Sequence, residues 1–384
     1  MSSKFSPNSF TLLIEHKRNR GVPLLDLTVS NPTQVFAEYP HDEIRRAYAN
    51  IVDFTYRPDP FGSKEARCAI AEVYSREGIP ISPDQFVLTA STSEAYALLF
   101  KLLCDPEDEV LAPAPSYPLF EFLAGLESVR FIPYRLRYDA AWRIDFRDLR
   151  ERISRRTRAI VIVNPNNPTG SFLKKGEKDE LFELARQHEL PVISDEVFMP
   201  YSLGNANQRA TTLISSDMVL SFSLNGLSKW AGMPQMKLGW IVINGPADKV
   251  AIARERLEVI ADTYLTVSTP VQEALPGLLK IGGAIQRLIV QRITRNLDAL
   301  DECLSNSPVH RLYTEGGWSV ILRLPETATE DAWMARLIEQ KEVVAHPGYL
   351  FDMDSEPFLV VSLVTPPQVF DEGIRRIGEL ASCC

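Results

Sequence analysis

The chain has 384 residues, of which 45% are hydrophobic and 24% are charged, with a formal net charge of −9 at pH 7. These values are ordinary for a folded protein of two domains, and the negative charge argues against a nucleic-acid surface or a basic membrane-binding face. The five cysteines are odd in number and mostly scattered, and no apolar run resembles a signal peptide or could span a bilayer, which together predict a soluble cytoplasmic protein.

Short runs of apolar and β-branched residues predict buried strands, and amphipathic segments between them predict helices. The strands are expected at Phe86 to Thr89, Val110 to Ala112, Ala159 to Val163, Pro191 to Ser194, Met218 to Phe222 and Lys237 to Ile243, and the helices at Ser93 to Leu103 and Lys178 to His188. Near-continuous apolar strands are typical of a parallel sheet covered by helices on both faces. The alternation predicts a large α/β domain over residues 41–275.

The pattern changes after about Pro270. A long helix is expected from about Ile285 to Leu304, followed by strands near Trp318 to Leu324 and Phe358 to Leu363, and by a closing helix that contains Phe370, Ile374 and Ile377. The short apolar run Leu24 to Val29 is expected to pack against this unit. Residues 1–40 and 276–384 are therefore predicted to form a small α+β domain with an N-terminal arm.

The first motif that carries chemistry is Leu88-Thr89-Ala90-Ser91-Thr92-Ser93-Glu94-Ala95. Here a strand runs into small hydroxyl residues at the start of a helix, where free backbone N–H groups and the helix dipole favour an anion such as phosphate. The ordinary alternative is that these residues only cap the helix, as Ser and Thr often do.

The second motif is Asn164-Pro165-Asn166-Asn167-Pro168-Thr169-Gly170, which follows an apolar strand. Two prolines and a glycine predict a sharp turn, and on their own they indicate nothing more. An asparagine between prolines at the carboxyl end of a strand is nevertheless well placed to donate to a ligand, because α/β sheets bind ligands at that edge.

Two further strand ends carry charged residues. Ser194-Asp195-Glu196 ends one strand with carboxylates, which either cap the next element or face a cation such as a protonated ring nitrogen. Gly226-Leu227-Ser228-Lys229 ends another strand, and Gly232 and Lys237-Leu238-Gly239 follow it. A loop lysine is usually solvated, but in an apolar neighbourhood its charged form is disfavoured and it can form a Schiff base.

In this order the segments resemble the class I and II aminotransferases of the fold-type-I pyridoxal-phosphate enzymes, the superfamily of aspartate aminotransferase. The resemblance covers nearly the whole chain, from Asn31-Pro32 and Tyr56-Arg57-Pro58 to Pro347-Gly348 and the last strand. Its most specific part is the Asn-Pro-x-Asn-Pro-Thr-Gly run with a downstream Ser-Lys. It implies a large α/β domain that binds pyridoxal 5′-phosphate and a smaller α+β domain.

The resemblance also implies a role for each matching residue. Lys229 would hold the cofactor as an internal aldimine and shuttle the proton of the substrate carbon, and Asp195 would pair with the pyridine nitrogen. Asn167 would contact the phenolic oxygen of the cofactor, and Tyr117 would stack on its ring. The phosphate would be held by Ser91, Thr92, Ser93, Ser228, Lys237 and Tyr56.

Tyr56 would reach the phosphate of a neighbouring subunit, which implies a homodimer with shared active sites. The ordinary alternative for Tyr56 and Tyr117 is a core aromatic residue. The other partners implied are a small-molecule amino donor and a keto acceptor, and we expect no nucleic acid, membrane or metal.

The sequence departs from the family pattern near the cofactor. The family usually has tyrosine where Phe198 stands, so a donor to the phenolic oxygen is lost, which should raise the pKa of the imine; Tyr201 is the nearest substitute. Lys237 replaces the usual phosphate-binding arginine and supplies a point charge in place of a bidentate fork. Gly226 replaces a serine three residues before the cofactor lysine.

A third departure concerns the substrate. An arginine in the last strand of family members forks onto the substrate carboxylate, and Val360 takes its place here. Replacements for it are Asn167, the backbone near Ser30, and Arg18 or Arg20 if the N-terminal arm folds over the site. Otherwise the substrate has no carboxylate at the reacting carbon.

Three functions stay open on this basis. The leading one is an aminotransferase that works by ping-pong exchange between pyridoxal and pyridoxamine forms, on an unusually bound amino acid, an amine or an amino-polyol. The second is a lyase or decarboxylase, because the same scaffold supports those reactions. The third is a non-catalytic regulator that binds the cofactor, against which Lys229, Asp195 and Asn167 are all present.

Overall fold

The centre of the protein is an eight-stranded sheet with the order β2-β9-β8-β7-β6-β3-β4-β5, seen in a computed structural model that describes residues 9–204, 207–214, 217–353 and 357–383. The five strands from β8 to β4 run parallel, whereas β9, β2 and β5 add antiparallel pairs at the two edges. The bounds are β2 (Phe86–Thr89), β3 (Glu109–Ala114), β4 (Arg130–Asp139), β5 (Ala141–Ile144), β6 (Thr157–Val163), β7 (Val192–Asp195), β8 (Ser221–Gly226) and β9 (Gly239–Asn244).

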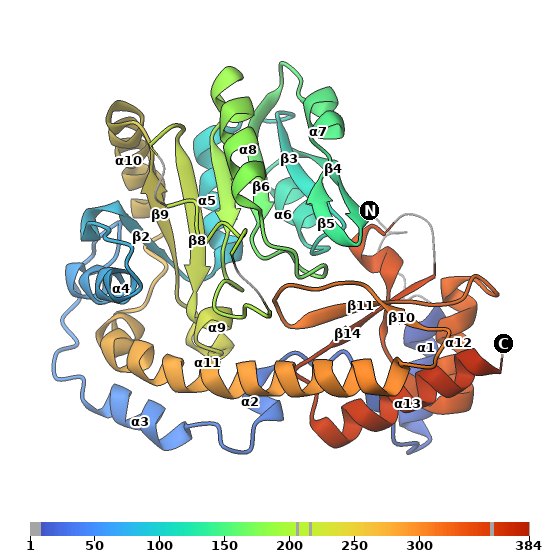
Figure 1. Cartoon of the computed structure of the whole chain (residues 1–384). Coiled ribbons are helices and arrows are strands. Elements are labelled where there is room, and N and C mark those ends of the chain that lie inside the picture. The colour runs from blue at the N-terminus through green and yellow to red at the C-terminus, as the bar shows by residue number, and fades with distance from the viewer. Residues whose placement is uncertain (1–8, 205–206, 215–216, 354–356, 384) are drawn as a thin grey trace.

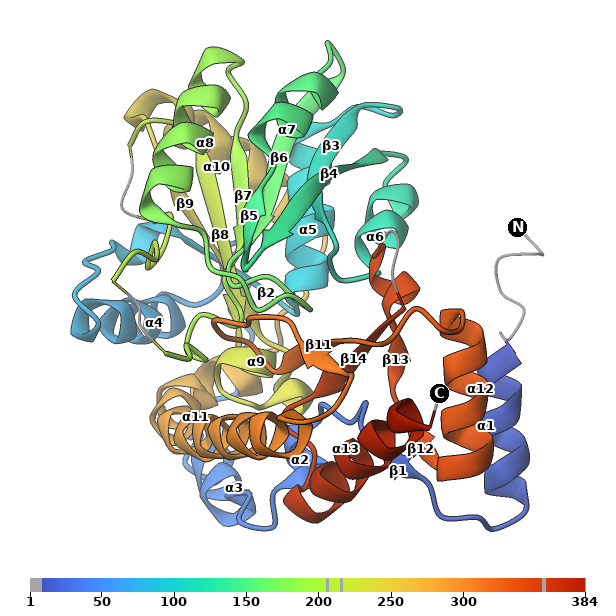
Figure 2. The ribbon, with the colours of Figure 1, turned by 45° about the vertical axis from the view of Figure 1, so that its right-hand side comes forward.

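Helices cover both faces of this sheet, which confirms the predicted fold class (Figures 1 and 2). α7 (Phe146–Arg152) and α8 (Lys175–Gln187) enclose one apolar layer, and α5 (Thr92–Leu103), α6 (Phe120–Leu126) and α10 (Ala247–Asp262) enclose the other. β2, β7 and β8 are buried along their whole length, because each strand is covered on both sides.

A second unit lies beside the large sheet, at the lower right of Figure 1. Its four-stranded sheet has the order β10-β11-β14-β13, with β10 (His310–Arg311), β11 (Ser319–Arg323), β13 (His346–Pro347) and β14 (Phe358–Ser362). β1 (Leu25–Asp26) pairs in parallel with β12 (Val343–Val344), and α1 (Ser9–Asn19) lies against α12 (Glu330–Lys341), as Figure 2 shows. The run Leu24 to Val29 thus joins this unit, as predicted.

Long and short helices connect the two units. α11 (Thr269–Leu304) runs beneath both in Figure 1 and contacts α3 (His41–Ala49), α4 (Lys64–Arg76) and α13 (Pro367–Ser382). The remaining helices are α2 (Pro32–Val35) and α9 (Leu227–Trp230), and 3₁₀ turns lie at Pro83–Gln85, Pro234–Met236 and Gly348–Phe351. The predicted domain boundary at residue 275 falls inside α11, so the division of the chain stays a prediction.

Several elements differ from expectation. α11 begins at Thr269 instead of near Ile285, and the strand expected from Met218 begins at Ser221. The β4–β5 hairpin and α10 were not expected at all. In the described part of the chain, no helix is both long and apolar enough to cross a membrane.

Candidate active site

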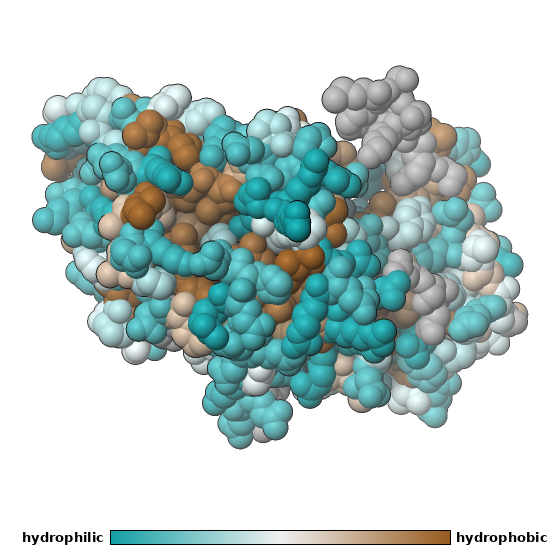
Figure 3. Space-filling view, turned by 90° about the horizontal axis from the view of Figure 1, so that it is seen from above, coloured by the Kyte–Doolittle hydropathy of each residue, from teal (hydrophilic) through white to brown (hydrophobic). Residues whose placement is uncertain are grey.

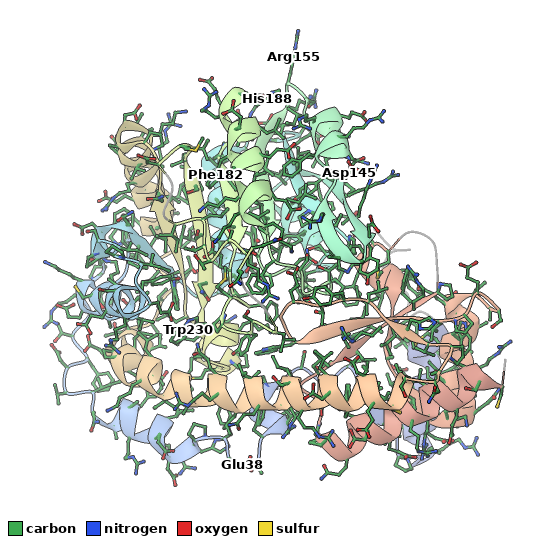
Figure 4. The ribbon with its side chains drawn as sticks, viewed as in Figure 1. Glu38, Asp145, Arg155, Phe182, His188 and Trp230 are labelled. Carbon is green, nitrogen blue, oxygen red and sulfur yellow. The ribbon has the colours of Figure 1, made fainter. Side chains whose placement is uncertain are left out.

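The four motifs lie at one edge of the large sheet. β6, β7 and β8 are neighbours that run in the same direction, so the Asn164 turn, Asp195 and Lys229 all follow carboxyl ends at the lower edge in Figure 1. Figure 4 places Trp230, the neighbour of Lys229, between this edge and α11, whereas His188 and Arg155 lie at the opposite edge. This is the edge at which open α/β sheets bind ligands.

Asp195 is a buried carboxylate with an exposed fraction of 8%. Its Oδ1 accepts from the backbone N–H of Val197 at 3.2 Å, and its Oδ2 accepts from the hydroxyl of Tyr96 at 3.2 Å. Burial raises the pKa of Asp195 to about 6, although these hydrogen bonds and the charge of Lys229 oppose the rise. A cationic ligand against this carboxylate would favour its ionised form.

Lys229 lies in α9, directly after β8. Its Nζ is 5.4 Å from the centre of the Trp318 ring and makes no hydrogen bond to any residue that the structure describes. Burial lowers the pKa of Lys229, and the Asp195 carboxylate opposes the lowering. A lowered pKa increases the share of neutral amine, which is the form that attacks a carbonyl carbon.

The hydroxyl motif forms the start of α5. Ser91 is the N-cap, and its Oγ accepts from the backbone N–H of Glu94 at 3.1 Å, so it does cap the helix as the ordinary alternative proposed. Thr92 and Ser93 form the first turn, whose backbone N–H groups have no intrahelical acceptor. The start of this twelve-residue helix therefore retains the donors that an anion requires.

Two glycines bring this helix start close to Lys229. A Cβ on Gly239 would lie 3.2 Å from the backbone carbonyl carbon of Ser91, and a Cβ on Gly226 would lie 2.9 Å from the Cα of Gly239. Ser228 follows Gly226 by two residues, and the exposed Lys237 precedes Gly239 by two. A side chain at Gly226 would therefore be crowded against the backbone of Gly239 and Leu238.

The three asparagines of the Asn164 to Gly170 motif differ in their hydrogen bonds. The Asn164 Oδ1 accepts from the backbone N–H of Leu173 at 3.0 Å, and the Asn166 Oδ1 accepts from the Thr169 hydroxyl at 2.9 Å. Asn167 is partly buried and its side chain hydrogen-bonds to none of the described residues. Its amide is the one left to bind a ligand.

The other predicted contacts lie around this centre. Tyr117 is 45% exposed and is close enough to Asp195 for the carboxylate to help raise the tyrosine pKa, after the larger effect of burial. Tyr56 is 70% exposed, so neither tyrosine is a core residue. Ser30 is exposed and precedes α2, where Pro32 is next to the Gly232 turn.

The structure also clarifies two of the departures from the family pattern, those at Phe198 and Val360. The Tyr201 hydroxyl donates to the backbone carbonyl of Lys229 at 2.6 Å, so it does not replace the hydroxyl missing at Phe198. Val360 is 2% exposed within an apolar cluster, and its antiparallel neighbour His346 has a pKa lowered by burial. The other buried residues of that cluster are Trp142, Leu312, Ile321, Phe351 and Phe358.

The N-terminal arginines do not cover the site. The Arg18 guanidinium donates to the Asp26 carboxylate at 3.3 Å, and Arg18 and Arg20 are both exposed.

A buried charged cluster fixes a loop next to the site. The Glu315 cluster consists of Lys174, Arg209 and Glu315, which are 8%, 3% and 6% exposed. Arg209 donates to one carboxylate oxygen of Glu315 at 3.2 Å, and Lys174 donates to the other. Glu315 belongs to the loop before β11, whereas both cations belong to the segments that follow β6 and β7.

Backbone contacts hold the same loop. The Glu315 N–H donates to the Gly170 carbonyl at 3.1 Å, and the Gly317 N–H donates to the Tyr201 carbonyl at 2.9 Å. Gly170 has a φ of +66°, and a Cβ there would lie 1.9 Å from Thr314 Oγ1, so only glycine fits. The loop that leads to Trp318 is therefore fixed on several sides.

Tyr96, Glu315 and Trp318 were not among the predicted site residues. Tyr96 lies one turn into α5, and its helical position after the hydroxyl motif was a weak signal for it. Glu315 and Trp318 reach the site only through the tertiary fold. Among the described residues, no three His, Cys, Asp or Glu side chains are grouped to hold a metal.

Known proteins share both the sequence and this fold. The profile of aminotransferase class I and II matches residues 23–377. Glutamate-pyruvate aminotransferase AlaA of Escherichia coli (strain K12) is 32% identical over 271 residues, which cover 70% of this chain and 67% of that protein. Tyrosine aminotransferase of Homo sapiens is 25% identical over 376 residues, which cover 94% of this chain and 82% of that protein.

Solved structures agree with these relatives. Alanine aminotransferase from Pyrococcus furiosus has a TM-score of 0.88 and 26% identity, and the match covers 98% of this chain and 96% of that one. An aminotransferase from Escherichia coli has a TM-score of 0.86 and 25% identity, and the match covers 100% of this chain and 98% of that one. The chain therefore belongs to the class I and II aminotransferases and is a pyridoxal-phosphate-dependent enzyme of fold type I.

Proposed function

We propose that Lys229 and Asp195 hold pyridoxal 5′-phosphate and carry out the proton chemistry of amino-group transfer. When bound, the cofactor supplies a carbon that joins to amines and a ring that takes up electrons from the substrate carbon. Lys229 Nζ binds the cofactor and then moves the proton of the substrate carbon. Asp195 keeps the ring nitrogen protonated. The observation that supports this most is a buried carboxylate with a raised pKa beside a buried lysine with a lowered one.

The surrounding side chains suit the other groups of this cofactor. A phosphate suits the start of α5, where Ser91, Thr92 and Ser93 lie, together with Ser228 and Lys237. The unengaged amide of Asn167 suits the phenolic oxygen. The aromatic ring of Tyr117, close to Asp195, suits the face of the pyridine ring.

The substrates proposed are an amino donor and a keto acceptor of small size. The relatives are named for glutamate, pyruvate, alanine and tyrosine, so these amino acids and their keto acids are the first to test. The buried Val360 means that the substrate carboxylate is held by other groups than a strand arginine, with Asn167 and the backbone near Ser30 as the proposed contacts.

The absorbance spectrum of the purified protein with pyridoxal phosphate tests this function. Glutamate, alanine, aspartate, tyrosine and simple amines are added one at a time. We expect at least one donor to convert the band of the Lys229-bound cofactor, and a keto acid to restore it. No cofactor band at all would refute the proposed roles of Lys229 and Asp195.

Asp195→Asn should lower kcat by roughly 10²- to 10³-fold, because it removes the carboxylate that pairs with the ring nitrogen and keeps that nitrogen protonated.

The affinity of the wild-type protein for the cofactor should also rise as the pH increases through about 6, where Asp195 becomes ionised and can pair with the ring. The variant keeps any contribution from the phosphate, so the difference between the two pH profiles isolates that of Asp195. Identical profiles and rates would contradict the pairing.

We also propose a homodimer in which Tyr56 completes the partner's site, in a cytoplasmic enzyme whose Cys68, Cys104, Cys303 and Cys383 are free. Support for the dimer comes from exposed apolar side chains near Tyr56, namely Val52 at 97% and Phe54 at 65%. Figure 3 shows hydrophobic patches on the upper face of the molecule, over its left and central parts.

Mixed dimers test this arrangement. A hybrid of Tyr56→Phe and Lys229→Ala subunits contains one site with both native residues, so a random mixture should regain up to about a quarter of wild-type activity. Each variant is also assayed alone under the same conditions. The shared-site proposal fails if Tyr56→Phe binds the cofactor normally or if mixing restores nothing.

A further inference from the structure

The indole of Trp318 lies next to the nitrogen of Lys229. Trp318 is 3% exposed, and its ring centre is 5.4 Å from Lys229 Nζ. The ring also packs edge to face against Phe198 at 5.4 Å and Tyr201 at 5.1 Å. Any ligand that Lys229 binds is therefore close to this indole.

The N–H group of this indole has no partner in the part of the chain that the structure describes. Trp318 Nε1 is buried and makes no hydrogen bond to the described residues, and the same is true of Trp142 Nε1. By contrast, Trp240 Nε1 donates to the Tyr74 hydroxyl at 3.1 Å and Trp333 Nε1 donates to the Pro325 carbonyl at 3.2 Å. Buried donors without partners are rare in native proteins because each loses its hydrogen bonds to water. An unpaired donor beside a ligand-binding lysine indicates that a ligand supplies the acceptor.

The indole is also held in one place before a ligand binds. The preceding residue, Gly317, donates to the Tyr201 carbonyl, and the Trp318 carbonyl accepts from the Leu363 N–H at 2.7 Å. Glu315, which precedes Trp318 by three residues, is held by ion pairs with Lys174 and Arg209. A donor fixed in this way loses little freedom when it binds an acceptor.

Two other donors for anionic oxygens are missing from this site. Phe198 has no hydroxyl, and the Tyr201 hydroxyl is engaged with the Lys229 carbonyl. Val360 has no charge and is buried in an apolar cluster. The site therefore lacks one donor on the side of the cofactor and one on the side of the substrate, and Phe198 is in direct contact with the indole.

We propose that the Trp318 indole N–H donates a hydrogen bond to an anionic oxygen of the molecule bound beside Lys229, which rests on the proposed function of Lys229. The oxygen has two sources, the phenolic oxygen of pyridoxal phosphate and the carboxylate of an amino acid substrate. In either case Trp318 is a binding residue that offsets the loss of a polar group at Phe198 or Val360.

The substitution Trp318→Phe tests the proposal, because it removes the N–H and keeps an aromatic ring. Trp333→Phe is the matched control, since it removes a buried indole in α12. The first measurement is the absorbance of the substrate-free holoenzyme against pH. If the phenolic oxygen is the acceptor, Trp318→Phe raises the pKa of the Lys229–cofactor linkage by about 1 to 2 units, the size of a hydrogen bond to a charged group, and the control does not.

Phe198→Tyr provides a second variant that does not disturb Trp318. Adding the hydroxyl should lower this linkage pKa more in the Trp318→Phe background than in the wild type, because only the former lacks a donor. This comparison also shows whether a shift comes from the lost hydrogen bond or from altered packing.

The second measurement compares L-alanine with ethylamine, which lacks the carboxylate, in the first half-reaction. If the carboxylate is the acceptor, Trp318→Phe weakens the binding of alanine by about 10- to 100-fold and leaves the binding of ethylamine unchanged. Unchanged linkage pKa and unchanged alanine kinetics in an active Trp318→Phe enzyme would overturn the proposal while the function of Lys229 stands. A wild type without a cofactor band would overturn both.

Discussion

Replacing Lys229 with alanine should lower kcat by about 10⁴-fold or more and leave the fold intact. A general base of this kind contributes up to about 10⁴-fold, and the attachment of the cofactor is lost as well. The fold should survive because the Lys229 side chain makes no hydrogen bond to the described residues, while its backbone carbonyl keeps the Tyr201 hydroxyl. Single-turnover assays with an amino donor measure the rate, and thermal unfolding of the cofactor-free protein measures stability.

Two controls separate the chemistry of Lys229 from the loss of one positive charge. Lys249→Ala removes an exposed lysine on α10 and should leave the rate unchanged. A small amine such as ethylamine, added to the Lys229→Ala enzyme, should restore part of the proton transfer. Near-normal transamination by Lys229→Ala would mean that another residue carries the chemistry.

Glu315→Ala should lower the free energy of unfolding by roughly 3–5 kcal/mol. The substitution leaves Lys174 and Arg209 buried without their counter-charge, which costs more than the ion pairs themselves contribute. It also frees the loop that carries Trp318 to the site, so activity should fall even where the protein is folded. The free energy of unfolding is measured by urea titration, and activity is measured well below the midpoint.

The matched control for Glu315 is an exposed glutamate with the same kind of partner. Glu183 pairs with Arg186 on the surface of α8, so Glu183→Ala should change the free energy of unfolding by no more than about 0.5 kcal/mol. Replacing Glu315, Lys174 and Arg209 together by apolar residues of similar size should be less harmful than Glu315→Ala alone. Equal effects of Glu183→Ala and Glu315→Ala would show that the buried cluster is not a special source of stability.

Much of the large sheet could be predicted because its strands are buried on both faces and stand out as apolar runs. β2 was predicted at Phe86 to Thr89, as found, and β6 and β7 within two residues. The β4–β5 hairpin was missed, because every residue of β4 except Tyr134 is exposed or only partly buried, so the strand lacks such a run.

The early start of α11 could not be predicted for a different reason. Pro276, Gly277 and Gly282 lie in its first half and normally indicate a break. Here the glycines serve close packing, since a Cβ on Gly277 would lie 3.0 Å from Ala47 and a Cβ on Gly282 would lie 2.8 Å from Ala231. Tertiary contacts decide this helix, and a single sequence does not show them.

The predicted site residues came from short motifs, and their roles stay predictions. Their positions at strand ends could be inferred because parallel strands end at the same edge. Glu315 and Trp318 could not be inferred, since each meets its partner across a long stretch of chain, and the only signal for Tyr96 was its helical position after the hydroxyl motif. Glu315, for example, contacts a lysine 141 positions earlier.

The pairing of β1 with β12 has a consequence for how this protein is made. Leu25 pairs with Val343, so β1 cannot form its strand pair until β12, more than 300 residues later, has been synthesised. At about 5 to 20 residues per second, a ribosome needs roughly 15 to 60 s to make the intervening 300 or so residues. During that time the eight-stranded sheet can form on the nascent chain, but Leu25 and Leu27 have no strand to join. Trp318, which lies beside Lys229, belongs to the second unit, so the proposed site is complete only after that unit has also been made.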